Sequence, residues 1–207
     1  MLQLQSVPRA TLDVLRHLSG QDYLKDFRLV GGTALALYWG HRVSVDLDFF
    51  TDNNVNLDVL EMNLEQKIEG AKMDSKNPIG RSYTINNVVC DFLNYPYRFQ
   101  HVAQNADGIQ LGHIDDVVTL KLGALANRGA KKGVYDLYYI LHAYTVPQLS
   151  EMYKTMYRVT DVFPLLKSLV YFGDAEEQLP PHLIKDKKLT CPQVKKFILN
   201  KVNEYVK

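Results

Sequence analysis

Residues 42–50, RVSVDLDFF, place polar and apolar side chains alternately and constrain the fold more than any other stretch. Alternation with a period of two predicts a β-strand with one packed and one polar face. The predicted packed face consists of Val43, Val45, Leu47 and Phe49. The opposite face then carries Asp46 and Asp48. The chain is therefore expected to build a sheet that holds two carboxylates on one side.

Two carboxylates two positions apart on a strand lie about 7 Å from each other and repel unless a cation sits between them. Mg²⁺ or Mn²⁺ is the usual solution, because hard cations bind carboxylate oxygens and keep coordination positions for phosphate. The alternative is that Asp46 and Asp48 are simply solvated on an exposed sheet face.

Gly31-Gly32 precedes this strand, between a predicted strand at 26–30 and a predicted helix at 33–40. Glycines at the start of a helix let the backbone approach a phosphate, and Thr33 is a candidate N-cap. The alternative is an ordinary tight turn. Asp91 lies in another predicted strand among apolar neighbours. It is either a third metal ligand or the salt-bridge partner of Arg42 or Arg81.

Hydrophobic periodicity predicts a mixed first half and a helical second half. In the first half we expect helices at 7–19 and 57–70, a hairpin at 81–95 with its turn at Asn86-Asn87, and then a loop. In the second half we expect helices at 113–128, 133–144, 148–159, 161–172 and 191–207. The predicted class is α+β, with a mixed sheet flanked by helices (1–110) and a C-terminal helical domain (111–207).

The composition argues against a strongly basic nucleic-acid-binding protein, a disulfide-linked or zinc-binding protein and a membrane protein. The 207 residues carry a net charge of +1, so binding of nucleic acid over a strongly basic face is not expected, although a local basic groove is possible. Cys90 and Cys191 form no metal or disulfide pattern. Charged residues interrupt positions 1–20, and no apolar run approaches the roughly 18–20 residues of a membrane span. These features predict a soluble cytoplasmic protein without membrane contact.

Residues 29–50, LVGGTALALYWGHRVSVDLDFF, resemble the AbiEii/AbiGii toxin family within the DNA polymerase β-like nucleotidyltransferase superfamily. KLGALANRG and YDLYYIL further along resemble a second block of that family. The resemblance covers about residues 25–180. It implies a nucleotidyltransferase fold and an enzyme that moves a nucleoside monophosphate from a nucleoside triphosphate to an acceptor and releases pyrophosphate.

The resemblance also implies roles for individual residues. Asp46, Asp48 and Asp91 would bind the divalent metal, and with Lys121 they would form the catalytic set. The residues implied in nucleotide binding are Gly31, Gly32, Thr33, Ser44, Arg128, Lys132 and Asp136. The alternative for Lys121 and Arg128 is a solvated helix face, and Asp136 would then pair with one of them.

One departure from the family pattern is Lys132-Gly133, where many relatives have Lys-Asp. It favours a second hypothesis, a non-catalytic module that binds a nucleotide or a partner protein. A third hypothesis is a sugar-nucleotide transferase, since D-x-D also occurs there. For the leading hypothesis, the resemblance implies the toxin of a toxin–antitoxin system, with RNA, possibly tRNA, as acceptor and a cognate antitoxin as partner.

Overall fold

The computed structural model describes residues 1–127, 131–173 and 178–206. The chain divides into two compact units, Met1–Ile114 and Asp115–Lys207. The first unit is a sheet with helices, and the second is helical. The α+β class predicted from the sequence is confirmed.

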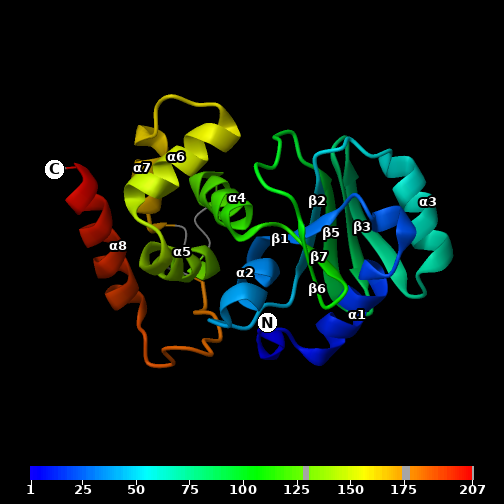
Figure 1. Ribbon diagram of the computed structural model, residues 1–207. Helices are drawn as coiled ribbons and strands as arrows, with labels where there is room; N and C mark the ends of the chain where they lie inside the picture. The colour runs from blue at the N-terminus through cyan, green and yellow to red at the C-terminus, as the bar shows by residue number, and fades with distance from the viewer. Residues whose placement is uncertain (128–130, 174–177, 207) are drawn as a thin grey trace. The chain divides into compact units, whose positions relative to one another are not determined.

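The first unit contains three α-helices, two short 3₁₀ helices and seven strands (Figure 1). In chain order they are η1 (Leu4–Ser6), α1 (Arg9–Ser19), η2 (Asp22–Leu24), β1 (Arg28–Val30), α2 (Gly31–Trp39), β2 (Leu47–Thr51), α3 (Leu57–Lys67), β3 (Ala71–Asn77), β4 (Gly80–Ile85), β5 (Val88–Asn94), β6 (Gln104–Ala106) and β7 (Ile109–Leu111).

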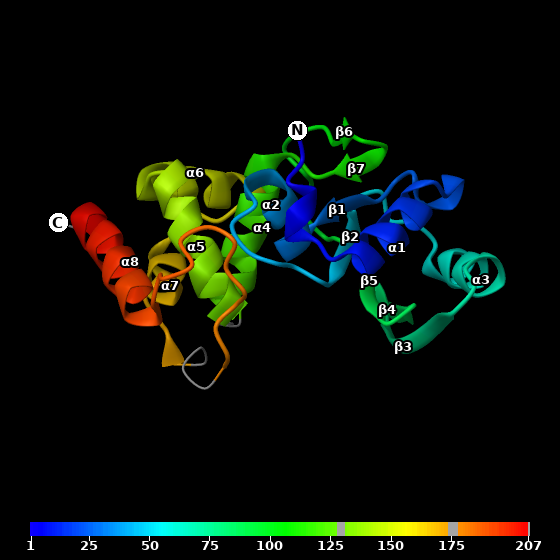
Figure 2. The same ribbon diagram turned by 90° about the horizontal axis from the view of Figure 1, so that it is seen from below.

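The seven strands form one mixed sheet in the order β3-β4-β5-β2-β1-β7-β6. β2 runs parallel to β5 and antiparallel to β1, and β1 runs parallel to β7. Figure 2 shows β3 and β4 at one end of this sheet and β6 and β7 at the other. The central strands β2 and β5 therefore have a hydrogen-bonded strand on each side; Asp48 lies in the middle of the sheet, and Asp46 lies just ahead of β2.

The packed face of the sheet is built from the alternate residues of β2 and β5. Leu47, Phe49, Cys90 and Phe92 are buried, and the rings of Phe49 and Phe92 stack with centroids 5.3 Å apart. α1 packs near β5 and α3 near β3 and β4, and each helix buries an apolar stripe there. Burial of these side chains drives the arrangement. The polar residues of β2 are thereby left on the other face.

The strand predicted at residues 42–50 is shorter than expected, because β2 spans only Leu47–Thr51. Ahead of it, Arg42 and Ser44 are buried and Val45 is exposed, which reverses the predicted faces. The Ser44 amide donates to the Ser6 carbonyl over 2.9 Å, so this segment runs along η1. The prediction that Val43 and Val45 belong to the packed face is therefore wrong.

The hairpin predicted at 81–95 is confirmed as β4 and β5, and Asn86 and Asn87 both adopt positive φ in its turn. The helices predicted at 7–19, 33–40 and 57–70 are confirmed within a few residues, and Gly40 ends α2 in the left-handed conformation. The strands β6 and β7 were missed, because they lie in the segment expected to be a loop, and no element was predicted where β3 lies.

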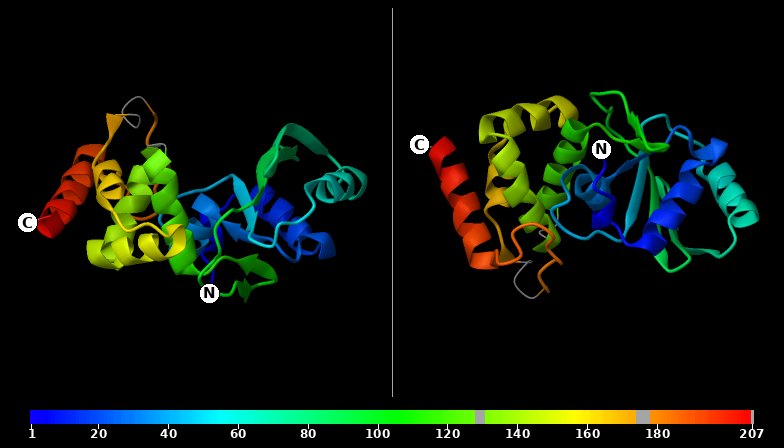
Figure 3. Two further views of the ribbon diagram at one scale, coloured as in Figure 1. Left: turned by 90° about the horizontal axis from the view of Figure 1, so that it is seen from above. Right: turned by 60° about the horizontal axis from the view of Figure 1, so that its bottom comes forward.

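The regular elements of the second unit are helices in its described residues, and residues 178–190 between them are irregular. The helices are α4 (Ile114–Asn127), α5 (Lys131–Ala143), α6 (Val146–Tyr157), α7 (Phe163–Leu169) and α8 (Cys191–Val206). α5 and α8 pack side by side, as both views in Figure 3 show. All five helices were predicted. In the described part of the chain, no helix is both long and apolar enough to cross a membrane.

Candidate active site

Asp48 and Asp91 lie directly beside each other on the polar face of the sheet. They are in register across the parallel strands β2 and β5, and each is half-buried. Neighbouring strands lie about 4.8 Å apart, and residues in register point to the same face. The sheet therefore brings together two carboxylates that are 43 positions apart in sequence.

Asp46 belongs to the same group. It is exposed just ahead of β2, and its carbonyl accepts a hydrogen bond from the Thr33 hydroxyl. Burial, together with the negative charges of Asp91, Asp48 and Asp46, raises the pKa of the neighbouring Cys90 thiol to about 12. The negative charges of all three carboxylates therefore act on the Cys90 thiol, which lies opposite Leu47 of β2.

Gly31 makes room for the Asp48 carboxylate. It starts α2 with a φ of +68°, and a Cβ at this position would lie 1.9 Å from Asp48 Oδ2. Any other residue would therefore combine a left-handed backbone with a direct collision. The structure thus shows a close approach of Asp48 to this glycine, and the close approach to a phosphate that the sequence predicted stays a prediction.

Gly32 has a similar relation to the segment before β2. A Cβ on Gly32 would lie 2.6 Å from Arg42 Nη2 and 3.3 Å from Ser44 Oγ. The Thr33 hydroxyl is 3.0 Å from Ser44 Oγ, and no side chain caps α2. Thr33 therefore ties the helix start to the D-x-D segment and does not serve as the N-cap that the sequence suggested.

Ser82 was not identified from the sequence, although it contacts the site directly. It lies opposite Asp91 on β4, and its hydroxyl donates to Asp91 Oδ1 over 2.5 Å. Its position follows from the predicted hairpin, because a two-residue turn at Asn86-Asn87 puts Ser82 opposite Asp91. Ser82 orients the third carboxylate of the group.

The salt bridge considered for Asp91 is absent from the described residues. Arg81 instead pairs with Asp58 and Glu61, over 2.7 and 2.8 Å, and is 7% exposed at its side chain. Arg42 is buried and donates to the Val43 carbonyl over 3.0 Å. Asp91 is thus held by the Ser82 hydroxyl and by neither arginine.

Asp48 and Asp91, side by side on the sheet, offer the carboxylate oxygens that suit a divalent cation of the Mg²⁺ type. The donors are oxygen atoms only; Asp48 and Asp91 lie on adjacent strands and on one face, and Asp46 lies just ahead of β2. Such a set suits a hard cation that keeps open positions for water and phosphate. Gly31 leaves space around Asp48 Oδ2, and Asp91 Oδ2 takes no part in the bond with Ser82.

In the second unit, Lys121 of α4 and Asp136 of α5 form an ion pair of 3.1 Å. The side chain of Asp136 is fully buried and that of Lys121 is 15% exposed. A buried carboxylate is stable only with such a partner. Asp136 therefore holds Lys121 in place and is not itself open to a ligand.

The remaining residues of the second block differ in their surroundings. Lys132 is exposed, and Gly133 is buried where α5 approaches α4. A Cβ on Gly133 would lie 2.8 Å from Leu125 Cδ2. An aspartate there would require a shift of the Leu125 side chain. Arg128, implied in nucleotide binding, lies outside the described residues.

The arrangement of the sheet and helices is shared with solved nucleotidyltransferases. A putative nucleotidyltransferase from Helicobacter pylori matches with a TM-score of 0.53 at 16% identity, over 96% of this chain and 95% of that one. The nucleotidyltransferase toxin MenT4 from Mycobacterium tuberculosis H37Rv matches with a TM-score of 0.52 at 15% identity, over 94% and 84%. At these identities the likeness establishes a nucleotidyltransferase fold.

Sequence comparison gives the family. Residues 13–187 match the profile of the family described as nucleotidyl transferase AbiEii toxin, type IV toxin–antitoxin system. An uncharacterised protein of Aquifex aeolicus (strain VF5) is 32% identical over 186 residues, which cover 87% of this chain and 88% of that protein. The chain belongs to the AbiEii family of nucleotidyltransferase toxins. The resemblance predicted from the sequence is confirmed, and the protein is a nucleotidyltransferase.

Proposed function

We propose that the protein transfers a nucleoside monophosphate from a nucleoside triphosphate to RNA, and that Asp46, Asp48 and Asp91 form its metal site. The observation that carries the proposal is the register of Asp48 and Asp91 on β2 and β5, with Gly31 leaving space for the first carboxylate. Like charges this close are stabilised by a bound cation.

A divalent cation such as Mg²⁺ or Mn²⁺, when bound, would stabilise negative charge on the attacking and leaving oxygens. Asp46, Asp48 and Asp91 would hold it. Gly31, Gly32 and Thr33 at the start of α2, with Ser44 bonded to Thr33, would orient the phosphates of the nucleoside triphosphate.

Asp91 is proposed to accept the proton of the acceptor hydroxyl. That oxygen then forms a bond to the α-phosphorus, the bond from this phosphorus to the α–β bridging oxygen breaks, and pyrophosphate leaves. The Ser82 hydroxyl bonds only one oxygen of Asp91, so the other oxygen is available for the proton. Geometry of this kind is the first requirement for a general base.

Lys121 is proposed to counter the charge of the triphosphate, with Lys132 and Arg128 as further candidates from the sequence. The support for Lys121 is its ion pair with the buried Asp136. This contact fixes the amino group and lets the remaining N–H donors serve a phosphate. In this account Asp136 acts through Lys121 and does not contact the nucleotide.

The biological proposal is a toxin that works in the cytoplasm, modifies RNA, with tRNA as the candidate acceptor, and is opposed by an antitoxin. Membership of the AbiEii family supports the toxin and antitoxin parts. The cytoplasm supplies nucleoside triphosphates and keeps thiols reduced, which agrees with the free Cys90 and Cys191.

The test is to incubate the protein with Mg²⁺, total RNA and each α-labelled nucleoside triphosphate in turn, beside the variant Asp46→Ala/Asp48→Ala. Label is expected in RNA with the wild type only, and the effective triphosphate names the donor. Label that is equal in both proteins would refute the proposed metal site. Triphosphate binding without any transfer would refute nucleotidyl transfer to RNA and favour a non-catalytic binding module.

A further inference from the structure

The positive charge of this chain is concentrated in its second unit. Residues 115–207 contain 14 lysines and arginines and 10 aspartates and glutamates, a net charge of +4. Residues 1–114 contain 10 and 13, a net charge of −3. Residues 182–196, which lead into α8, contain five lysines and one acidic residue. This basic segment alone accounts for the net charge of its unit.

Most lysines of the basic segment have no acidic partner. Among the described residues, no ion pair involves Lys185, Lys187, Lys188 or Lys196, and all four are exposed. By contrast, Lys154 and Lys201 of the same unit are bound to Glu151 and Glu204. The single acid of the segment, Asp186, accepts a hydrogen bond from the Tyr139 hydroxyl over 3.0 Å. The segment therefore presents uncompensated positive charge.

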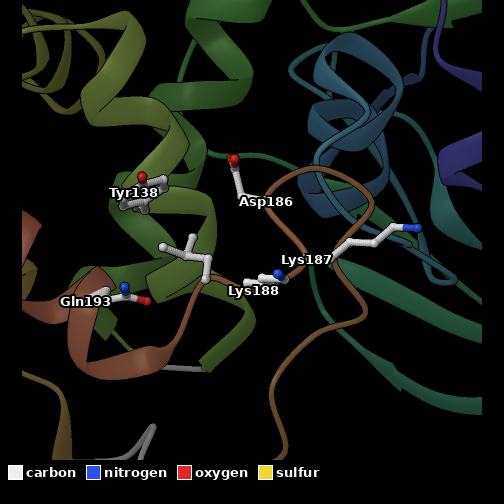
Figure 4. A pocket seen from close by; sticks show the side chains of 6 residues that line it. Tyr138, Asp186, Lys187, Lys188 and Gln193 are labelled. Atoms are coloured by element: carbon white, nitrogen blue, oxygen red, sulfur yellow. The ribbon is translucent and has the colours of Figure 1, made fainter.

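The basic segment also borders a cavity of about 430 Å³ (Figure 4). Its lining consists of Tyr138, Asp186, Lys187, Lys188, Leu189 and Gln193. The ring of Tyr138 is fixed by Phe197 and His142, with centroids 4.8 and 4.6 Å away. The cavity thus combines the Lys188 ammonium group, the Asp186 carboxylate, an amide and a fixed aromatic ring, and the Lys187 side chain extends away from Tyr138 (Figure 4).

We propose that the basic segment and this cavity bind a single-stranded stretch of the acceptor RNA. The unpaired lysines would contact successive phosphates, and Tyr138 would contact a base in the cavity. A positive groove with an aromatic platform is the general arrangement for single-stranded nucleic acid. The inference rests on the proposed function, since it locates the acceptor of that reaction.

A positively charged segment could also bind an acidic protein. The composition of this segment favours RNA. Protein interfaces are depleted in lysine and depend on buried aromatic or apolar anchors. Between residues 182 and 196, all of which are described, no large apolar side chain is exposed. The segment has the charge of a nucleic-acid site without the anchors of a protein interface.

The experiment is a fluorescence-anisotropy titration of a short labelled single-stranded RNA, repeated over a range of salt concentrations. The test variant is Lys185→Gln/Lys187→Gln/Lys188→Gln. The control, Lys154→Gln/Lys167→Gln/Lys201→Gln, removes the same charge elsewhere in the unit. Each phosphate contact on a single strand contributes about 0.7 to the slope of log K against log salt. The test variant should therefore lose about 2 from that slope and bind roughly tenfold more weakly.

Unchanged binding by the test variant, or equal weakening by the control, would overturn the proposal. So would weakened binding of polyglutamate together with unchanged binding of RNA, which would indicate an acidic protein partner. Thermal melting of both variants checks that they fold. The variant Asp46→Ala/Asp48→Ala should bind RNA like the wild type. A failure of label transfer with lysine-dependent RNA binding intact would therefore refute the catalytic proposal alone.

Discussion

In the first unit Asp48 and Asp91 lie abreast on neighbouring strands, half-buried, with a serine hydroxyl as the partner of Asp91. In the second unit Asp136 is fully buried and is bound to Lys121. The sheet thus gathers like charges where solvent and ligands reach them, while the helices bury one charge against its opposite. The neighbouring carboxylates of the sheet repel each other unless a cation binds them, whereas the buried Asp136 is already stabilised by Lys121.

The largest effect is expected at Asp136. Asp136→Ala leaves Lys121 without the partner that stabilises it, and breaking a buried pair costs about 3–5 kcal/mol. The free energy of unfolding, measured by urea denaturation, should fall by that amount. Glu151→Ala, which breaks the exposed pair with Lys154, should cost no more than about 1 kcal/mol. Similar losses in both variants would contradict the structural role given to Asp136.

Asp136→Ala should mainly lower stability. Asp48→Asn, by contrast, should lower activity more than stability. The amide keeps the shape of the side chain but removes a charge from the proposed metal site. Transfer of label from the triphosphate should fall roughly 10²–10³-fold, as for other groups that stabilise transition-state charge. The free energy of unfolding should change by less than about 1 kcal/mol, because Asp48 is half-buried. Full activity in this variant would contradict the view that the carboxylates of the first unit bind a ligand while the paired carboxylate of the second unit has a structural role.

Gly31→Ala tests whether the space beside Asp48 matters. The new methyl group would collide with the carboxylate, so the rate of label transfer should fall about 10²-fold through misplacement of a reacting group. Gly108→Ala is the matched control, because Gly108 has a φ of +77° and nothing within 4 Å of its Cβ position. Both variants should lose about 1–2 kcal/mol of stability from backbone strain. Only the first should lose activity.

Ser82→Ala should give the smallest effect. It removes one hydrogen bond to a charged group, which is typically worth about 1.5–3 kcal/mol, so activity should fall roughly tenfold or more. Ser75→Ala is the control, because Ser75 is exposed and is the next residue across the sheet, opposite Ser82. Equal rates for both variants would show that Ser82 does not position Asp91.

The paired carboxylates of the sheet and the helical second unit could largely be predicted from the sequence. Alternation and helical periodicity indicate directly which side chains are buried. The hairpin turn at Asn86-Asn87 even fixes the register that places Ser82 opposite Asp91. β3 could not be predicted in this way. Its sequence AKMDSKN is almost entirely exposed, and it forms because β4 offers free backbone hydrogen bonds at an edge.

The segment before β2 shows another limit of pattern analysis. Its alternation is genuine, but hydrogen bonds to Ser6 and Thr33 hold it outside the sheet, and these contacts come from distant parts of the chain. The reason for Gly31 was likewise hidden, since a collision with Asp48 depends on how β1 and β2 pair. Local patterns predict which face is buried, whereas close approaches depend on tertiary pairing.

The most direct test of the central claim is Mn²⁺ binding in the presence of a nucleoside triphosphate, followed by electron paramagnetic resonance. The comparison is between the wild type, Asp48→Asn and Asp74→Asn; Asp74 is an exposed acid on β3, bound by Thr84. The account predicts that the wild type and Asp74→Asn bind Mn²⁺ equally and that Asp48→Asn loses this binding. Equal binding by all three proteins would contradict a metal site at the carboxylates of β2 and β5.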